Sequence, residues 1–206
     1  MTFRNFKAIF FDWDNTLVDT WPVLLDSSNA VLRHFGKSEI SLEEVKIRAR
    51  LSSRESFPEQ FGESWEEALS IFYKAIDANK ENIKLFDGAA SLIESLKKSN
   101  KIVVIISNKK KDLLRSEVKR FGISNDLILG SGDATFDKPH PEMGIIALKH
   151  FQLQPNEVVY VGDSITDWNF AKNLDMPAIA IGDEAYEGPL LARFSSINES
   201  MQEFIS

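Results

Sequence analysis

Four short runs of apolar residues, in which polar residues do not alternate with apolar ones, most constrain how this chain can fold. They cover residues 8–11, 102–106, 158–161 and 178–181, and a weaker fifth run covers residues 127–129. Continuous apolar strands are typical of parallel sheets, because helices cover both faces of such a sheet. The runs therefore predict buried, parallel strands.

Segments with helical periodicity lie between these runs, at residues 89–98, 112–121, 142–151 and 166–173. Strands that alternate with helices along a chain indicate βαβ units. We therefore expect an α/β core built on a doubly wound parallel sheet.

The connection from residue 20 to residue 85 interrupts this alternation. It contains no convincing strand, whereas apolar residues recur at helical spacing between Trp21 and Phe35. A segment of this length is too long for an ordinary loop. We therefore expect an inserted all-α helical cap domain at residues 20–85, and a core domain made of residues 1–19 and 86–206.

Two Ser-x-x-Glu patterns in this segment, Ser41 with Glu44 and Ser64 with Glu67, predict the beginnings of two further helices. In such a capping box, the serine hydroxyl accepts a hydrogen bond from the glutamate N–H, and the glutamate carboxylate accepts one from the serine N–H.

The charge balance narrows the class of partner. The chain has 24 Lys and Arg against 31 Asp and Glu, a formal net charge of −7. A non-specific nucleic-acid binder needs a basic face, so we expect no nucleic-acid partner. A small phosphorylated molecule stays compatible with this charge, because a bound cation reverses the local field.

The absence of cysteine and the hydropathy pattern exclude further classes of site and of protein. The chain contains no cysteine, which excludes disulfides, thiol catalysis and cysteine-ligated metals. No apolar segment approaches the length of a membrane span, and the first run is too short for a signal peptide. We therefore expect a soluble cytoplasmic protein with no membrane partner.

Acidic and small polar residues follow the predicted strands. Asp12 and Asp14 come directly after the first run, and residues two apart on an extended chain point the same way. Ser107 and Asn108 follow the second run, and Asp163 follows the third. Because open α/β sheets bind ligands at the carboxyl ends of their strands, we expect these residues to meet at one edge.

A cation is needed to hold several carboxylates together, since they otherwise repel one another. Hard oxygen ligands, in a chain with no cysteine and three histidines, favour Mg²⁺ over zinc or copper. Mg²⁺ often takes phosphate oxygens as further ligands, which indicates phosphoryl transfer.

Several motifs occur in a fixed order along the chain: Asp12-x-Asp14-x-Thr16, then Ser107, Lys138 and Gly162-Asp163-Ser164-x-x-Asp167. This ordered set resembles the haloacid dehalogenase-like hydrolase superfamily. The helical insertion after the first motif resembles the subgroup with a small cap, which includes phosphoglycolate phosphatase and β-phosphoglucomutase. The resemblance covers essentially the whole chain and implies a Rossmann-like core.

The resemblance implies catalytic roles for three residues. Asp12 resembles the nucleophile that attacks phosphorus and becomes an aspartyl phosphate. Asp14 resembles the general acid that protonates the leaving oxygen and then the base that activates water. Lys138 resembles the lysine that neutralises the nucleophile and the phosphate together.

The resemblance also implies a phosphate site. Thr16 and Ser107 resemble hydroxyl donors to the transferring phosphoryl group. The backbone N–H groups of Trp13, Asp14 and Asn108 are expected to complete this cradle.

A Mg²⁺ site is implied in the same way. Its expected ligands are a carboxylate oxygen of Asp12, the backbone carbonyl of Asp14 and the carboxylate of Asp163. Asp167 resembles an outer partner that orients Lys138 or a water on the metal.

One position departs from the family pattern, because Asn15 stands where glycine is usual. If this position needs a positive φ, asparagine is the best-tolerated substitute for glycine. We therefore expect the turn to form.

Together these implications predict a Mg²⁺-dependent phosphatase that hydrolyses a small phosphomonoester metabolite, such as phosphoglycolate or a sugar phosphate. A phosphomutase of the β-phosphoglucomutase type needs the same motifs and stays open, as does a less favoured phospho-accepting regulatory protein. Substrate choice is expected in the cap, where Arg54 is the first candidate to bind a substrate carboxylate. A solvated helix face explains its basic surroundings equally well. Monomer and homodimer both fit the sequence.

Overall fold

The computed structural model describes residues 5–186 and 188–205 of the chain. The chain divides into two compact units, one formed by residues 1–18 and 85–206 and the other by residues 19–84. We call these the sheet unit and the helical unit and describe each by itself.

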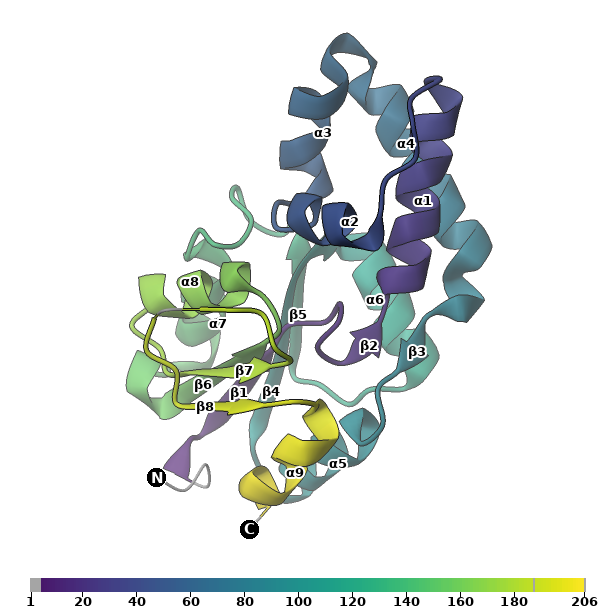
Figure 1. Ribbon diagram of the computed structural model, residues 1–206. Helices are drawn as coiled ribbons and strands as arrows, with labels where there is room; N and C mark the ends of the chain where they lie inside the picture. The colour runs from purple at the N-terminus through teal and green to yellow at the C-terminus, as the bar shows by residue number, and fades with distance from the viewer. Residues whose placement is uncertain (1–4, 187, 206) are drawn as a thin grey trace. The chain divides into compact units, whose positions relative to one another are not determined.

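The sheet unit contains six parallel strands in the order β5-β4-β1-β6-β7-β8 (Figure 1). The strands are β1 (Ala8–Phe11), β4 (Ile102–Lys110), β5 (Leu127–Ser131), β6 (Val158–Gly162), β7 (Ala178–Ile181) and β8 (Ala192–Phe194). The chain runs from β1 outward to β4 and β5, and then returns to β6 on the other side of β1. This reversal confirms the doubly wound fold, and such folds bind ligands where the strand order reverses.

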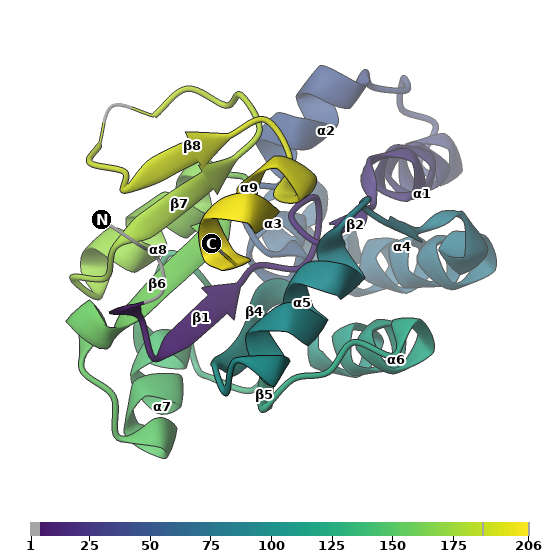
Figure 2. The same ribbon diagram turned by 90° about the horizontal axis from the view of Figure 1, so that it is seen from below.

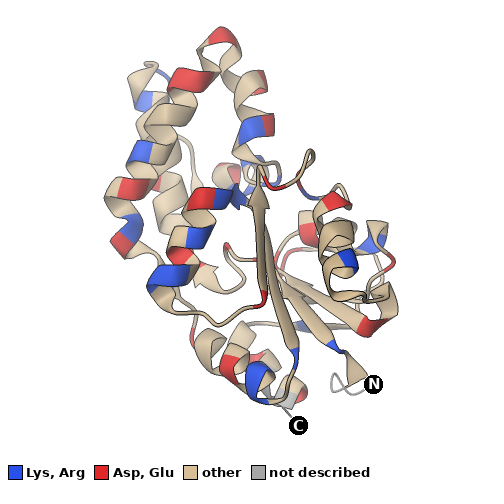
Figure 3. Cartoon of the chain, turned by 180° about the vertical axis from the view of Figure 1, so that it is seen from behind, with Lys and Arg blue, Asp and Glu red and all other residues tan. Residues whose placement is uncertain are grey.

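Helices cover both faces of this sheet. They are α5 (Ala89–Lys98), α6 (Lys111–Phe121), α7 (Glu142–Phe151), α8 (Ile165–Asn173) and α9 (Ile197–Ile205). Helices α5 and α9 pack against each other on one face, and α7 and α8 lie on the opposite face (Figure 2). The strands therefore carry few charged residues along most of their length, whereas the helices and connections carry many (Figure 3).

Two elements of the sheet unit have no counterpart in the predicted set, β8 and α9. Strand β8 lies at the edge of the sheet and its residues are exposed or half-buried, so it lacks a continuous apolar sequence. Strand β4 is longer than its apolar run. It continues to Lys110, and its register with β5 shifts between Ile106 and Lys110.

The helical unit contains α1 (Trp21–His34), α2 (Leu42–Arg48), α3 (Ser53–Phe61) and α4 (Trp65–Asn79). Aromatic rings fill its interior, where Phe57 packs against Phe61 and Phe72. The expectation of no strand between residues 20 and 85 was wrong at its end, because β3 (Lys84–Leu85) pairs with β2 (Val18–Asp19). Among the described residues, every helix is too short or too polar to cross a membrane.

The two predicted capping boxes have different outcomes. Ser41 and Glu44 form theirs at the start of α2, with Oγ accepting at 3.3 Å and the carboxylate accepting at 2.9 Å. Helix α4 does begin after Ser64, but the predicted box with Glu67 was wrong. Ser64 ends a short 3₁₀ turn and has φ −89° and ψ 9°, whereas a capping serine needs an extended backbone.

This difference predicts how two equivalent substitutions change stability. Ser41→Ala is expected to lower the free energy of unfolding by about 1 kcal/mol, because one helical N–H loses its acceptor. Ser64→Ala, the matched control, is expected to change it by less than about 0.5 kcal/mol. Urea denaturation followed by circular dichroism measures both, and equal losses would contradict the assignment.

Candidate active site

A tight turn carries the first two acids beyond β1. The N–H of Asp12 still donates to the carbonyl of Val161 on β6, at 2.9 Å, so Asp12 lies at the very end of the sheet pairing. The chain then turns, and the N–H of Asn15 donates to the carbonyl of Val18 at 2.6 Å. Asn15 has φ 63°, the left-handed conformation that favours glycine and that asparagine tolerates. The turn forms as expected despite the missing glycine.

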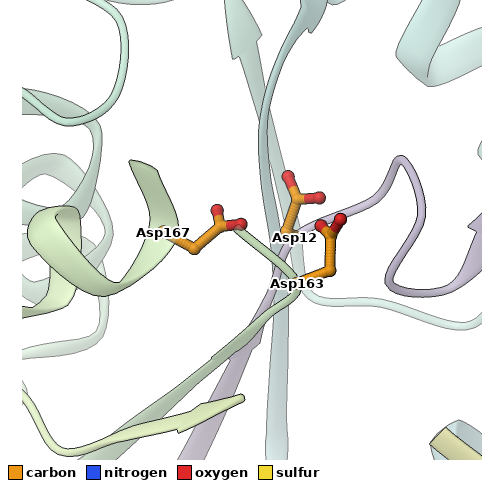
Figure 4. A group of neighbouring side chains, drawn as sticks. All are labelled: Asp12, Asp163 and Asp167. Atoms are coloured by element: carbon orange, nitrogen blue, oxygen red, sulfur yellow. The ribbon is translucent and has the colours of Figure 1, made fainter. Parts of the chain in front are cut away.

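Three carboxylates gather where β1 and β6 end. One oxygen from each of Asp12, Asp163 and Asp167 lies within 4.8 Å of the other two. Asp12 and Asp163 point to the same side of the sheet edge, and Asp167 approaches them from the first turn of α8 (Figure 4). Asp12 is 6% exposed and Asp167 is 1% exposed, so these are not solvated surface acids.

The buried Lys138 lies among these carboxylates. Its Nζ is 2.6 Å from Asp12 Oδ1 and 2.7 Å from Asp167 Oδ1, and it also donates to the Tyr160 hydroxyl at 2.9 Å. The Asn108 side chain fixes the backbone of the same lysine. It donates to the Lys138 carbonyl and accepts from the Lys138 N–H, both at 2.8 Å. Asn108 thus positions the Lys138 loop, a contact that the sequence did not predict.

The electrostatics of this group are unbalanced. Burial raises the pKa of Asp12 to about 7, and Asp167 and Asp14 add to the rise while Lys138 opposes it. Burial, with the charges of Asp167 and Asp12, also holds the pKa of Asp163 well above its usual range. The carboxylates raise the pKa of Lys138 and keep it charged despite its burial. When ionised, three carboxylates face one ammonium group and leave an excess of two negative charges.

Of the two predicted hydroxyl donors, Thr16 contacts this group and Ser107 contacts the backbone of Lys109. Thr16 is fully buried, and its hydroxyl donates to Asp163 Oδ1 at 3.1 Å. Ser107 is buried on β4, and its hydroxyl accepts from the N–H of Lys109 at 3.1 Å. Ser107 and Asn108 were expected just beyond the strand, but they lie inside β4, where its register with β5 shifts.

Asp14 lies apart from the three grouped carboxylates and has its own cationic partner. Lys109 Nζ is 2.6 Å from Asp14 Oδ1 and 2.9 Å from Glu117 Oε2. Neither Lys109 nor Glu117 was predicted as a site residue. Arg54 lies in the first turn of α3, in the helical unit, and its proposed contact with substrate stays a prediction.

The N-terminal turn of α8 holds the Asp167 side chain in place. Its Oδ2 accepts from the N–H and the hydroxyl of Ser164, at 3.2 and 2.7 Å, in a capping box. Gly162 leaves the space for this arrangement, because a Cβ at that position would lie 2.4 Å from Asp167 Cβ. The sequence pattern Gly-Asp-Ser therefore carries a steric requirement as well as a turn.

The sequence of this chain is similar to those of known proteins. Residues 9–181 match the sequence profile of the haloacid dehalogenase-like hydrolase family. A phosphoglycolate phosphatase of Xylella fastidiosa is 27% identical over 180 residues, which cover 84% of this chain and 79% of that protein. The pyrophosphatase PpaX of Bacillus velezensis is 28% identical over 177 residues, covering 84% of this chain and 82% of its own.

Solved structures share the fold. A putative haloacid dehalogenase-like hydrolase from Bacteroides fragilis superimposes with a TM-score of 0.86 at 24% identity, covering 94% of this chain and 98% of that one. CbbY from Rhodobacter sphaeroides, solved in complex with phosphate, gives a TM-score of 0.83 at 18% identity, covering 95% and 96%. At these identities the likeness shows the fold alone.

Gly162→Ala is expected to lower the free energy of unfolding by about 1–3 kcal/mol, the usual cost of overpacking a dense site. The added methyl group overlaps Asp167, so either the strand end or the aspartate must move. Urea denaturation measures the change. A loss below about 0.5 kcal/mol, the size seen at tolerant surface positions, would contradict the tight packing of Gly162 on Asp167.

Proposed function

Because the chain belongs to the haloacid dehalogenase-like hydrolases, we propose that this phosphatase depends on Mg²⁺ and hydrolyses a small phosphomonoester through an aspartyl phosphate on Asp12. The observation that carries the proposal is the group formed by the buried Asp12 and Lys138 and the half-buried Asp163 at the reversal of the sheet. Phosphatases among the relatives support the reaction class.

The donor set fits Mg²⁺. Oxygen ligands suit this ion, and the excess of two negative charges among the grouped carboxylates equals its charge. We assign the carboxylates of Asp12 and Asp163 and the backbone carbonyl of Asp14 as its protein ligands. When bound, Mg²⁺ neutralises charge on the phosphoryl oxygens and aligns them with the attacking carboxylate.

The proposed reaction has two steps. A carboxylate oxygen of Asp12 bonds to phosphorus while the bond from phosphorus to the leaving oxygen breaks, and Asp14 gives its proton to that oxygen. Water then attacks the phosphorus of the aspartyl phosphate and passes a proton to the Asp14 carboxylate. Phosphate leaves, and Asp12 is restored as a carboxylate.

Lys138 and the hydroxyl groups have supporting roles in this proposal. Lys138, 2.6 Å from Asp12, offsets negative charge on the nucleophile and on the phosphoryl group as they approach. Thr16 and Ser107, with the backbone N–H groups of Trp13, Asp14 and Asn108, are proposed to bind the phosphoryl oxygens. Arg54 remains the proposed contact to the rest of the substrate.

The raised pKa values predict a pH-dependent effect of Mg²⁺ on stability. The folded-state pKa values of Asp12 and Asp163 exceed the unfolded value of about 3.9, so the free energy of unfolding falls as pH rises from about 4 through 7. Mg²⁺ binds the ionised carboxylates and relieves this loss. At a concentration ten times its Kd at pH 8, Mg²⁺ is expected to add about 1.4 kcal/mol to the free energy of unfolding at that pH, or about 3–6 °C in Tm. The same concentration is expected to add clearly less at pH 5.5.

Thermal denaturation with MgCl₂, against KCl at equal ionic strength, measures this effect. Asp163→Asn is expected to remove the Mg²⁺-dependent shift at both pH values. A shift that is equal at pH 5.5 and pH 8, or that survives in the variant, would contradict the metal assignment.

Asp12→Asn tests the proposed nucleophile. Wild-type protein with Mg²⁺ is expected to release phosphate from an aryl phosphate, and the variant is expected to lose about 10³-fold or more of kcat/KM. Asp112→Asn, an exposed position on α6, is the matched control and should keep full activity. The proposal would be contradicted if Asp12→Asn released phosphate as fast as the wild-type protein. It would also be contradicted if the protein were phosphorylated without turnover.

A further inference from the structure

A second buried charge group lies beside the catalytic turn and is separate from the Asp12 group. Lys109, at the end of β4, is placed between two carboxylates, with Nζ 2.6 Å from Asp14 Oδ1 and 2.9 Å from Glu117 Oε2. The side chains of Lys109 and Glu117 are each 7% exposed, and that of Asp14 is 22% exposed. The more exposed end of this group is therefore the carboxyl of Asp14.

Glu117 accepts a further hydrogen bond on the oxygen that contacts Lys109. The indole N–H of Trp13, which is fully buried, donates to Glu117 Oε2 at 2.8 Å. Because Trp13 and Asp14 are consecutive, the contacts form a closed ring: Trp13 to Glu117, Glu117 to Lys109, and Lys109 back to Asp14. The ring joins the turn after β1 to the first residues beyond Ser107 and to α6.

Stability alone does not account for such a ring. Burying an ion pair costs desolvation free energy that its attraction often fails to offset. Burial disfavours the charged form of Glu117 and raises its pKa, although the charge of Lys109 acts in the opposite direction. What the ring does achieve is geometric, since Lys109 holds Asp14 Oδ1 at 2.6 Å and is itself held by Glu117.

We propose that Lys109 and Glu117 are positioning residues that hold the Asp14 carboxyl in line with the leaving oxygen of the substrate. This inference rests on the proposed function. In the first step the electron pair of the breaking P–O bond passes to the leaving oxygen, which takes a proton from Asp14 Oδ2, the oxygen that Lys109 does not contact. Lys109 contacts Asp14 directly, and Glu117 acts through Lys109. A misplacement of about 1 Å is enough to cost about 10²-fold in rate.

The leaving group provides the test. A nitrophenolate departs without a proton, whereas an alkoxide needs one, so poor placement of the acid penalises alkyl phosphates selectively. We expect Lys109→Met to lower kcat/KM by about 10²-fold for glycerol 2-phosphate and by about 3-fold or less for p-nitrophenyl phosphate. Glu117→Gln, which keeps the shape and an acceptor for the indole, is expected to act in the same direction and more weakly. The ratio kcat/KM is the right measure because it reports the step in which the leaving group departs.

Two further proteins make the result decisive. Lys119→Met, an exposed position on α6, the helix that carries Glu117, is the matched control and should leave the hydrolysis of both substrates unaffected. Lys109→Met in an Asp14→Asn background should cause no additional loss, because a residue that acts through Asp14 has nothing left to position.

The outcomes separate this inference from the proposed function. If wild-type protein hydrolyses neither substrate with Mg²⁺, the proposed function fails. If it hydrolyses both and Lys109→Met lowers them equally, or lowers neither, the positioning role is wrong. An additive loss in the double variant would also overturn it.

Discussion

The ion pair between Lys138 and Asp12 is the interaction on which the site depends. Both side chains are buried, and their charged atoms lie 2.6 Å apart with Asp167 on the other side of the lysine. A lone buried carboxylate at this position would simply take up a proton. Asn108 bonds to the backbone of Lys138, and the Tyr160 hydroxyl accepts from its ammonium group. These contacts hold the ammonium group next to Asp12.

The sheet explains why these groups meet. β1 and β6 are neighbours whose connections leave in opposite directions, and folds of this type bind ligands at the carboxyl ends of such strands. Asp12 and Asp163 follow those two strands. Burial and neighbouring carboxylates raise the pKa of both, and a divalent cation would lower that cost. The same strand arrangement that stabilises the core therefore gathers an excess of negative charge that a divalent cation can neutralise.

The sequence predicted those parts that depend on local pattern or strand order. β1, β6 and β7 followed from continuous apolar runs, and the meeting of Asp12 with Asp163 followed from their places after strands. β8 was not predicted, because an edge strand does not need a continuous apolar run. Glu117 was not predicted as a site residue for a different reason. Its contact with Trp13 spans 104 residues and depends on where α6 packs, which no local sequence pattern encodes.

The central claim is that Asp12 carries the phosphoryl group during turnover. Mass spectrometry of the protein, quenched in acid during turnover of an aryl phosphate with Mg²⁺, tests it most directly. Asp14→Asn serves as the trapping variant, because it slows hydrolysis of the intermediate. The account predicts one added phosphoryl group on the peptide that contains Asp12. Turnover with that peptide unmodified in both proteins, or a phosphoryl group on another residue, would contradict it.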